Sequence, residues 1–139
     1  MRNSRYRLSR LVMVISAILF FIAGVYSLAK PLEALSKLTL APTDNVQWLF
    51  MFMGVLMIAL SINQGTTSRN AADPTFRSVA VLSILIEGAM AGIIYLGPGE
   101  LSRVRWILIG ICLFIGLLYI ITLPIKSMGY KEENPPTSH

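Results

Sequence analysis

Four long apolar runs, separated by short polar stretches, constrain the fold of this chain more than any other feature. They lie at about residues 11–29, 45–63, 76–96 and 106–125, and each is 19 to 21 residues long. An α-helix rises about 1.5 Å per residue, so about twenty residues cross the hydrocarbon of a bilayer, which is about 30 Å thick. The sequence therefore predicts an all-α transmembrane four-helix bundle, in which short loops make successive helices antiparallel neighbours.

The composition is that of a membrane protein. Of the 139 residues, 55% are hydrophobic and 14% are charged, whereas a soluble domain has about 25% charged residues. The formal net charge is +5, and four arginines precede the first apolar run, namely Arg2, Arg5, Arg7 and Arg10. This clustering is typical of membrane topology rather than of nucleic-acid binding. We therefore expect contact with a lipid bilayer and no nucleic-acid partner.

The first apolar run has an alternative interpretation as a cleaved signal peptide. Ser27-Leu28-Ala29 resembles a small-x-small cleavage site after a basic segment. However, the run of 19 uncharged residues is longer than a usual signal-peptide core of about 7–15 residues. We therefore interpret residues 11–29 as a retained membrane span.

The stretch after the first span predicts a short helix lying in the membrane interface. Pro31 can occupy the first helical position, and Leu32, Leu35 and Leu38 follow at helical spacing. An irregular loop with leucines dipped into lipid is the alternative interpretation.

The other polar stretches contain helix start and stop signals. Thr43-Asp44 predicts the start of the second span. The polar residues 64–75 predict a turn, in which Asp73 is the N-cap of the third span and Pro74 takes the first helical position. Gly97-Pro98-Gly99 ends the third span, and Ser102 is a plausible cap for the fourth. The polar, proline-containing residues 127–139 are expected to form a disordered cytoplasmic tail after a membrane domain at 1–126.

The distribution of basic residues predicts the orientation. Four spans place both termini on one side of the membrane, and that side carries eight lysines and arginines against four on the other. Because basic loops stay in the cytoplasm, we expect a multi-pass protein of the cell (inner) membrane with both termini cytoplasmic. The eight are Arg2, Arg5, Arg7, Arg10, Arg69, Arg77, Lys126 and Lys131, and the four are Lys30, Lys37, Arg103 and Arg105.

The third run carries a carboxylate near its middle. Glu87 is the tenth of the 19 residues of Ser78–Leu96, so it should lie near the centre of the hydrocarbon, where a charge is costly. No basic residue lies at the same depth, so we expect a protonated carboxyl that faces the bundle interior. It is either a proton-binding or cation-binding site, or a neutral acid held by hydrogen bonds or by another subunit.

Small and polar residues predict the inward helix faces, because helices in a bilayer associate through such residues. We expect the hydroxyls of Ser83 and Tyr119 to be the hydrogen-bonding partners of Glu87, and Cys112 is also placed to approach it. Stripes at seven-residue spacing include Ser9, Ser16 and Ala23 in the first span, Gln47, Gly54 and Ser61 in the second, and Arg105, Cys112, Tyr119 and Lys126 in the fourth. The candidate helix-packing residues are Gly88, Gly92, Gly54, Ser61 and Gly116.

The sequence offers no set of residues for catalysis, a cofactor or a metal. The single histidine, His139, is the last residue, and the single cysteine, Cys112, has no intrachain disulfide partner. No pair of carboxylates has metal-ligand spacing, and no serine lies in a nucleophile elbow. We therefore expect a protein that is not an enzyme and that has no cofactor or metal.

The four spans are each about twenty residues long. Glycines lie within the first three spans and a proline follows the first, namely Gly24, Pro31, Gly54, Gly88 and Gly92. In this arrangement the chain resembles small four-helix bacterial inner-membrane families of unknown function, including the DoxX-like group. The resemblance covers nearly the whole chain and implies a four-helix membrane bundle. Some of these families place an arginine inside the second or third span. This chain has none in the middle of either span, so no functional residue is transferred.

The chain is also similar in size to the small multidrug-resistance transporters, which use one membrane glutamate. In those transporters the glutamate lies in the first helix, whereas Glu87 lies in the third. We therefore expect an accessory or assembly subunit, or a self-associating module that forms a homo-oligomer. The alternative is a small proton-coupled carrier of a lipophilic or cationic compound that uses Glu87.

Overall fold

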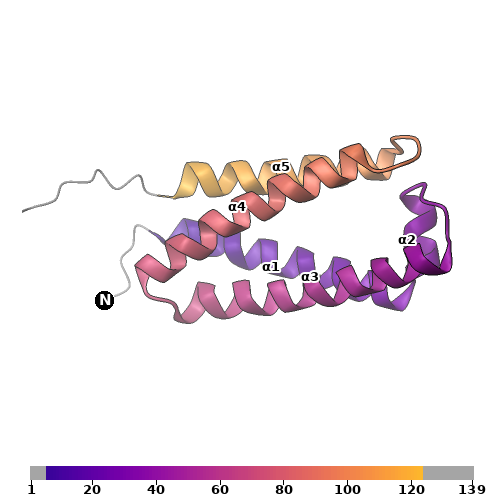
Figure 1. Ribbon diagram of the computed structural model, residues 1–139. Coiled ribbons are helices and arrows are strands. Elements are labelled where there is room, and N and C mark those ends of the chain that lie inside the picture. The colour runs from indigo at the N-terminus through magenta and orange to yellow at the C-terminus, as the bar shows by residue number, and fades with distance from the viewer. Residues whose placement is uncertain (1–5, 124–139) are drawn as a thin grey trace, which may run out of the picture.

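The chain folds into five helices over the part that the structure describes (Figure 1). The computed structural model describes residues 6–123, so the predicted tail at 127–139 lies outside the described residues. The helices are α1 (Arg7–Ala29), α2 (Pro31–Lys37), α3 (Asp44–Asn70), α4 (Asp73–Leu96) and α5 (Arg103–Thr122). All of them except α2 are long and apolar enough to cross a membrane. The all-α class and the four long apolar helices are confirmed.

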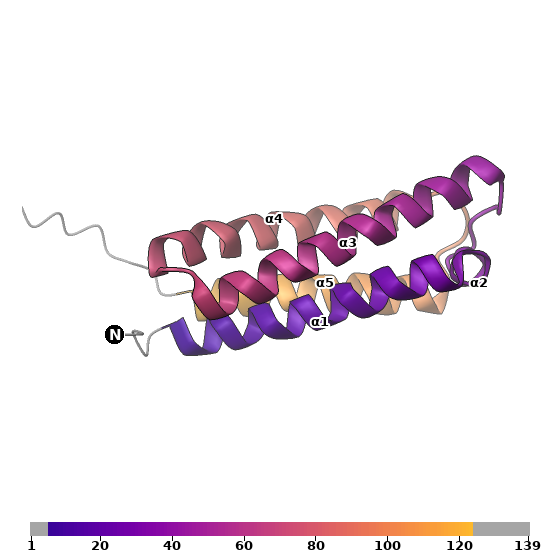
Figure 2. The ribbon, with the colours of Figure 1, turned by 90° about the horizontal axis from the view of Figure 1, so that it is seen from below.

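The long helices form two antiparallel pairs. α1 packs along α3, and α4 packs along α5, whereas the two pairs contact each other less extensively and do so mainly through α1 and α5. In Figure 1, α4 begins close to the end of α3 and diverges from it toward the end where α2 lies. Figure 2 shows the same bundle from below, with α1 and α3 nearest the viewer. The centre of the molecule therefore lies between two helix pairs.

Two glycines allow α1 and α3 to approach closely. A Cβ atom on Gly24 would lie 2.7 Å from the carbonyl oxygen of Gly54, and one on Gly54 would lie 3.0 Å from the carbonyl oxygen of Gly24. Real Cβ atoms are not found at the shorter of these distances, so the crossing needs a residue without a side chain at Gly24. Gly54, one of the candidate packing residues, thus lies at the contact of two helix backbones.

The second span is longer than the sequence predicts. The polar residues Gln64, Thr67 and Ser68 continue α3 to Asn70 instead of forming a loop, and all three side chains are buried. The exposed hydroxyl of Thr66 donates to backbone carbonyl oxygens one turn earlier, at 2.9 and 3.0 Å. Polar residues therefore remain helical here because their side chains bond within the protein.

The helix ends follow most of the local signals. A short helix, α2, occupies the stretch that follows Pro31, as predicted. Ser102 Oγ accepts the Arg105 backbone N–H at the start of α5. At the start of α4 the N-cap position is Ala72, without a side-chain cap bond, in place of the predicted Asp73.

The α2 region is tied to the loop between α4 and α5. The Thr39 hydroxyl donates to the Glu100 carbonyl oxygen at 2.7 Å, and the Ser102 hydroxyl donates to the Lys37 carbonyl oxygen at 3.0 Å. These bonds hold the two loops together at the end of the bundle away from the termini. They close the end at which α3 and α4 diverge.

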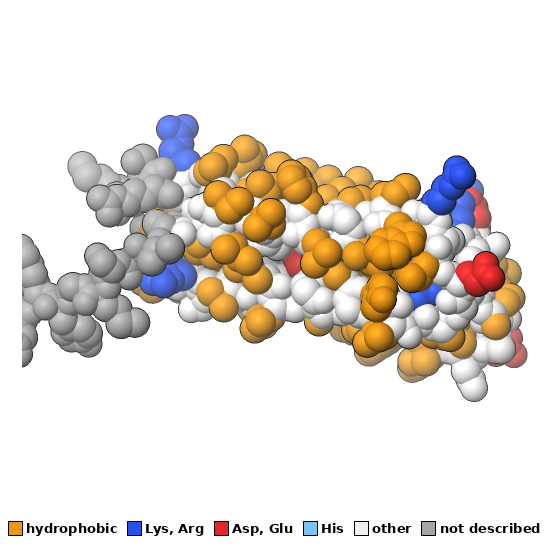
Figure 3. All heavy atoms as spheres, turned by 90° about the horizontal axis from the view of Figure 1, so that it is seen from above, with side chains coloured by type: hydrophobic (Ala, Val, Ile, Leu, Met, Phe, Trp, Pro, Cys, Tyr) orange, Lys and Arg blue, Asp and Glu red, His pale blue; other side chains and the backbone are white. Residues whose placement is uncertain are grey.

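The outer surface is apolar along the length of the helices. Large hydrophobic side chains are exposed on all four long helices, such as Phe21 on α1, Trp48 on α3, Leu85 on α4 and Ile121 on α5. Figure 3 shows hydrophobic side chains over the middle of one face and most of the charged side chains near the two ends. Since such a surface is stable in lipid rather than in water, the chain is a multi-pass integral membrane protein.

Candidate functional site

Glu87 lies inside the bundle, near the middle of α4. Its side chain is 2% exposed, and it shares the buried face of α4 with Ala80, Ser83 and Ala91. These residues are spaced three or four apart, so they lie on one side of a helix. The α4 face that carries the small residues therefore points inward at Glu87, and the carboxyl is enclosed by the other helices.

Ser16 of α1 is a direct hydrogen-bonding partner of Glu87. Ser16 Oγ lies 3.0 Å from Glu87 Oε1, and Ser16 is fully buried. The sequence assigned this role to the hydroxyls of Ser83 and Tyr119, and the structure corrects that assignment. Ser83 donates instead to the Val79 carbonyl oxygen of its own helix, at 2.9 Å.

Gln64 of α3 connects Ser16 to Ser83. Ser16 Oγ lies 3.2 Å from Gln64 Oε1, and Gln64 Nε2 donates to Ser83 Oγ at 3.0 Å. Glu87, Ser16, Gln64 and Ser83 therefore form one hydrogen-bonded chain that runs from α4 through α1 and α3 and back to α4. We call these four side chains the Glu87 network.

The fourth long helix, α5, contributes three residues around the Glu87 network. Tyr119 is fully buried, and its hydroxyl lies beside Ser16 and Ser83 without a hydrogen-bond partner. The half-buried Cys112 places its thiol beside the Glu87 carboxyl. A Cβ atom on Gly116 would lie 3.8 Å from Glu87 Cβ, an ordinary packing distance. Residues of α1, α3 and α5 therefore contribute to the site around Glu87 of α4.

Sequence reasoning missed two site residues, Ser16, which it placed only in an inward stripe of the first span, and Gln64. Gln64 stands directly after the uncharged run that ends at residue 63, and the polar residues around it suggested a loop. A signal was nevertheless present, because Ser61, Gln64 and Ser68 recur at spacings of three and four and so share a helix face. The helical spacing of these polar residues thus continues beyond residue 63, where the apolar run of the second span ends.

Arg105 is buried at one end of the α4/α5 pair, with 2% of its surface exposed. Its guanidinium donates to backbone carbonyl oxygens at the end of α4 and in the following loop, those of Ile94, Gly97, Pro98, Gly99 and Glu100. A helix leaves its last carbonyl groups without partners and has a partial negative charge at that end, so a guanidinium satisfies both. The guanidinium N–H groups of Arg105 thus bind backbone carbonyl oxygens of its own chain.

Arg10 has a corresponding place at the other end of the bundle. Its guanidinium donates to the carbonyl oxygens of Ser68 and Ala71 at 2.9 and 2.8 Å, at the end of α3. It also lies over the Phe76 ring, 4.7 Å from the ring centroid, where a cation is attracted to the aromatic face. An arginine from another helix therefore covers the C-terminal end of both α3 and α4.

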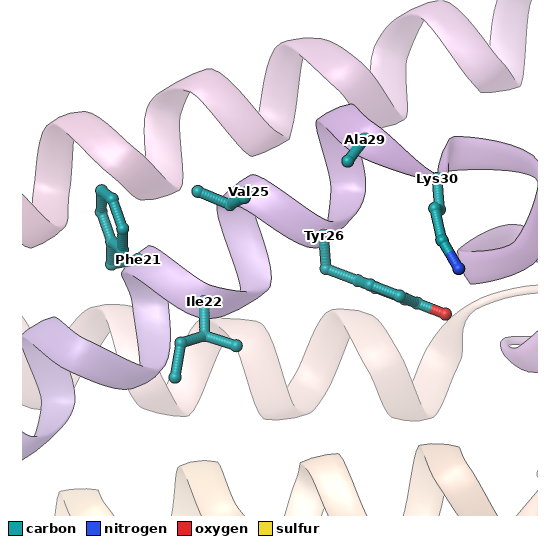
Figure 4. A pocket seen from close by; sticks show the side chains of 6 residues that line it. All are labelled: Phe21, Ile22, Val25, Tyr26, Ala29 and Lys30. Atoms are coloured by element: carbon teal, nitrogen blue, oxygen red, sulfur yellow. The ribbon is translucent and has the colours of Figure 1, made fainter.

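Two shallow surface grooves lie on the outside of the bundle. One, of about 330 Å³, is lined by residues of α1 and the start of the next loop, namely Phe21, Ile22, Val25, Tyr26, Ala29 and Lys30 (Figure 4). The other, of about 490 Å³, runs between α1 and α3. Neither is lined by a member of the Glu87 network. Over residues 6–123, no three His, Cys, Asp or Glu side chains are grouped so that they could hold a metal ion.

The chain was compared with protein-family models, with curated proteins and with solved structures, and no match was found. The resemblance to the DoxX-like group therefore stays a prediction.

Proposed function

We propose that this membrane protein acts by associating with other membrane chains, as an accessory or assembly subunit or with copies of itself, and that it is not an enzyme. The observation that carries the proposal is an open glycine pair on α4. Gly88 is exposed and Gly92 is half-buried. A Cβ atom on either glycine would meet no other atom within 4 Å.

The open pair has the spacing that lets helices pack closely in lipid. Gly88 and Gly92 are four residues apart and so lie one turn apart on the same side of α4. The large side chains of Leu85, Ile93 and Leu96 are exposed on the same helix. Because lipid and leucine are equally apolar, a partner helix gains most where it can reach the backbone, as α1 and α3 do at Gly24 and Gly54.

Substitution of the open glycines tests this proposal. Gly88→Leu and Gly92→Leu fill the approach to the α4 backbone, and each should leave the fold intact because nothing lies within 4 Å of either Cβ position. Gly65→Leu is the matched control, since Gly65 is equally open but lies on α3. The measurement is the oligomeric state and the co-purifying chains after extraction in a gentle detergent.

The expected result is a stoichiometric assembly for the parent protein and for Gly65→Leu, and its loss in Gly88→Leu and Gly92→Leu. Recovery of the parent protein as a monomer without a stoichiometric partner would contradict the proposal. Unchanged assembly in both α4 variants would contradict the assignment to this face.

A specific observation favours a second candidate, a proton-coupled carrier of a lipophilic or cationic compound. The carboxyl of Glu87 lies at mid-span and bonds to side chains of other helices, and ionisable groups at this depth often bind transported protons or ions. Glu87→Gln distinguishes the two candidates. A carrier should lose pH-dependent transport in proteoliposomes, whereas assembly through α4 should continue.

The proposed location is the cell (inner) membrane, with both termini in the cytoplasm. The support is the excess of basic residues on the side of the termini, which holds eight of the twelve. Single cysteines introduced into a Cys112→Ser background test the orientation. A membrane-impermeant thiol reagent added outside should modify a cysteine in the α4–α5 loop and not one at Asn70.

A further inference from the structure

Ser16 has one hydroxyl proton but lies within hydrogen-bond distance of two oxygens. Ser16 Oγ is 3.2 Å from Gln64 Oε1 and 3.0 Å from Glu87 Oε1. An amide oxygen can only accept, and an ionised carboxylate can only accept. If Ser16 donates to Gln64, the contact with Glu87 is a hydrogen bond only when the carboxyl itself carries a proton.

With a protonated Glu87, the network is a complete series of donors and acceptors. The Glu87 carboxyl donates to Ser16 Oγ, and Ser16 donates to Gln64 Oε1. Gln64 Nε2 donates to Ser83 Oγ, which donates to the Val79 carbonyl oxygen. Each hydroxyl donates once and accepts once, so every bond points in the same direction, away from Glu87.

A second complete arrangement exists for an ionised Glu87. The oxygen and nitrogen of an amide have similar sizes, so a half-turn of the Gln64 amide exchanges them without displacing a neighbour. Gln64 Nε2 then donates to Ser16, and Ser16 donates to the Glu87 carboxylate. Ser83 gives up its bond to the Val79 carbonyl oxygen and donates its single proton to Gln64 Oε1 instead. The carboxylate gains a charge-assisted bond, and the direction of the series is reversed.

We propose that Ser16, Gln64, Ser83 and Glu87 form one proton-binding site in which loss of the Glu87 proton and reversal of the Gln64 amide occur together. Ser16 and Gln64 are positioning residues, and the ligand is a single proton. The other titratable groups that face Glu87 are Cys112 and Tyr119 of α5. Among the side chains that the structure describes, Arg105 is the only other buried charged one, and it bonds to the end of α4.

The site joins the two helix pairs. Ser16 and Gln64 belong to the α1/α3 pair, whereas Ser83 and Glu87 belong to α4. The pairs contact each other less extensively than the helices within a pair. Two bonds of the network cross between the pairs, that of Ser16 with Glu87 and that of Gln64 with Ser83. The inference is independent of the proposed association, because its residues point to the centre of the bundle and Gly88 lies on the outer surface.

Infrared difference spectroscopy of the full-length protein in a lipid nanodisc, across a pH titration, tests the proposal. The carbonyl band of a protonated carboxylic acid is assigned to Glu87 by its loss in Glu87→Gln. The side-chain amide band of Gln64 is assigned by its loss in Gln64→Leu, with Gln47→Leu on the same helix as the matched control. Both bands should change at one midpoint in the parent protein.

Ser16→Ala should separate the two events. The Glu87 band should still titrate, but the pH-dependent change of the Gln64 band should be lost, because the hydroxyl that connects the two groups is gone. Ser27→Ala is the control, since Ser27 is also buried on α1 but bonds to its own helix, at Ala23 O. It should keep both changes and their common midpoint.

Glu87→Gln provides a test that does not depend on the folding of Ser16→Ala. Its side-chain amide has nearly the shape of the neutral acid and donates to Ser16 in the same way, so the Gln64 band should be fixed at all pH values. The proposal would be overturned if the Gln64 amide band of the parent protein did not change when Glu87 titrates. It would also be overturned by a carboxyl band that never changes while the protein stays folded.

Discussion

The α1/α3 pair and the α4/α5 pair are both antiparallel, but different residues bring their helices together. In the first pair, Gly24 and Gly54 place the two backbones in contact. In the second, Arg105 of α5 binds the backbone carbonyls at the end of α4, while the α4 glycines Gly88 and Gly92 touch nothing within 4 Å. In the first pair, glycines allow the two backbones to touch, whereas in the second an arginine of one helix binds the carbonyl end of the other.

This difference shows that a pair of small residues in a membrane helix indicates where another helix can pack closely. It does not indicate which helix packs there. Gly24 and Gly54 form a contact between two helices of the same chain, whereas the Gly88–Gly92 pair faces the bilayer or another protein. Close packing in lipid is driven by the fit of two surfaces. A glycine contributes only where a second helix is positioned to meet it.

The largest expected effect is that of Gly24→Leu. Its Cβ atom would lie 2.7 Å from Gly54 O and 2.8 Å from Ile58 Cγ1, so α1 and α3 must separate. We expect a loss of at least about 3 kcal/mol in the free energy of unfolding, the upper range for overpacking. Gly88→Leu should change the free energy by less than about 0.5 kcal/mol, as is usual for a surface substitution. Similar losses for both variants, in reversible denaturation in mixed micelles, would remove the distinction between the two glycine pairs.

Arg105→Met should have the next largest effect. It keeps the length of the apolar stem but removes the donors that bind the α4 carbonyls, and we expect a loss of about 2 kcal/mol. Arg105→Lys should recover part of this, because an ammonium keeps the charge without the fork of donors. The control is Arg103→Met, since Arg103 is exposed on the same helix. The same unfolding measurement applies, and equal stability of the two Met variants would contradict the role of Arg105.

Ser16→Ala tests the contact between the pairs. It removes the hydroxyl that lies 3.0 Å from Glu87 and 3.2 Å from Gln64, and we expect a loss of about 1 kcal/mol. Tyr119→Phe is the contrasting substitution, because the Tyr119 hydroxyl is buried without a partner. Its removal should leave thermal stability unchanged or raise it. A larger loss for Tyr119→Phe than for Ser16→Ala would restore the role that the sequence predicted for Tyr119.

The smallest effect concerns Glu33 on α2, in the connection between the two helices of the first pair, α1 and α3. Hydrogen bonds from Lys37, Tyr26 and Lys30 lower the pKa of Glu33 from 4.5 to about 2. A lowered folded-state pKa means that the stabilisation is complete above pH 4.5 and is lost as the pH falls toward 2. Because Glu33 is fully exposed, salt should screen its ion pairs. A thermal-stability difference between Glu33→Gln and the parent protein that is as large at pH 2 as at pH 7 would contradict this assignment.

The sequence by itself determined the local features of this protein. The four apolar helices follow from hydrophobicity over about twenty residues, the helix after Pro31 from its leucine spacing, and the cap at Ser102 from one side chain. The period of α4 was also sufficient to turn Glu87 inward with Ala80, Ser83 and Ala91, whereas Gly88 is exposed and Gly92 is half-buried. These properties depend only on neighbours along the chain.

Only the tertiary structure decided which distant residues meet. It selected Ser16 rather than Tyr119 as the partner of Glu87, brought Gln64 into the network from a stretch that resembled a loop, and directed Arg105 at the end of α4. The physical reason is that helices in lipid are apolar on their outer faces as well. Hydrophobic pattern therefore fixes the depth of each helix, but its rotation and its partner depend on how small and polar side chains fit together.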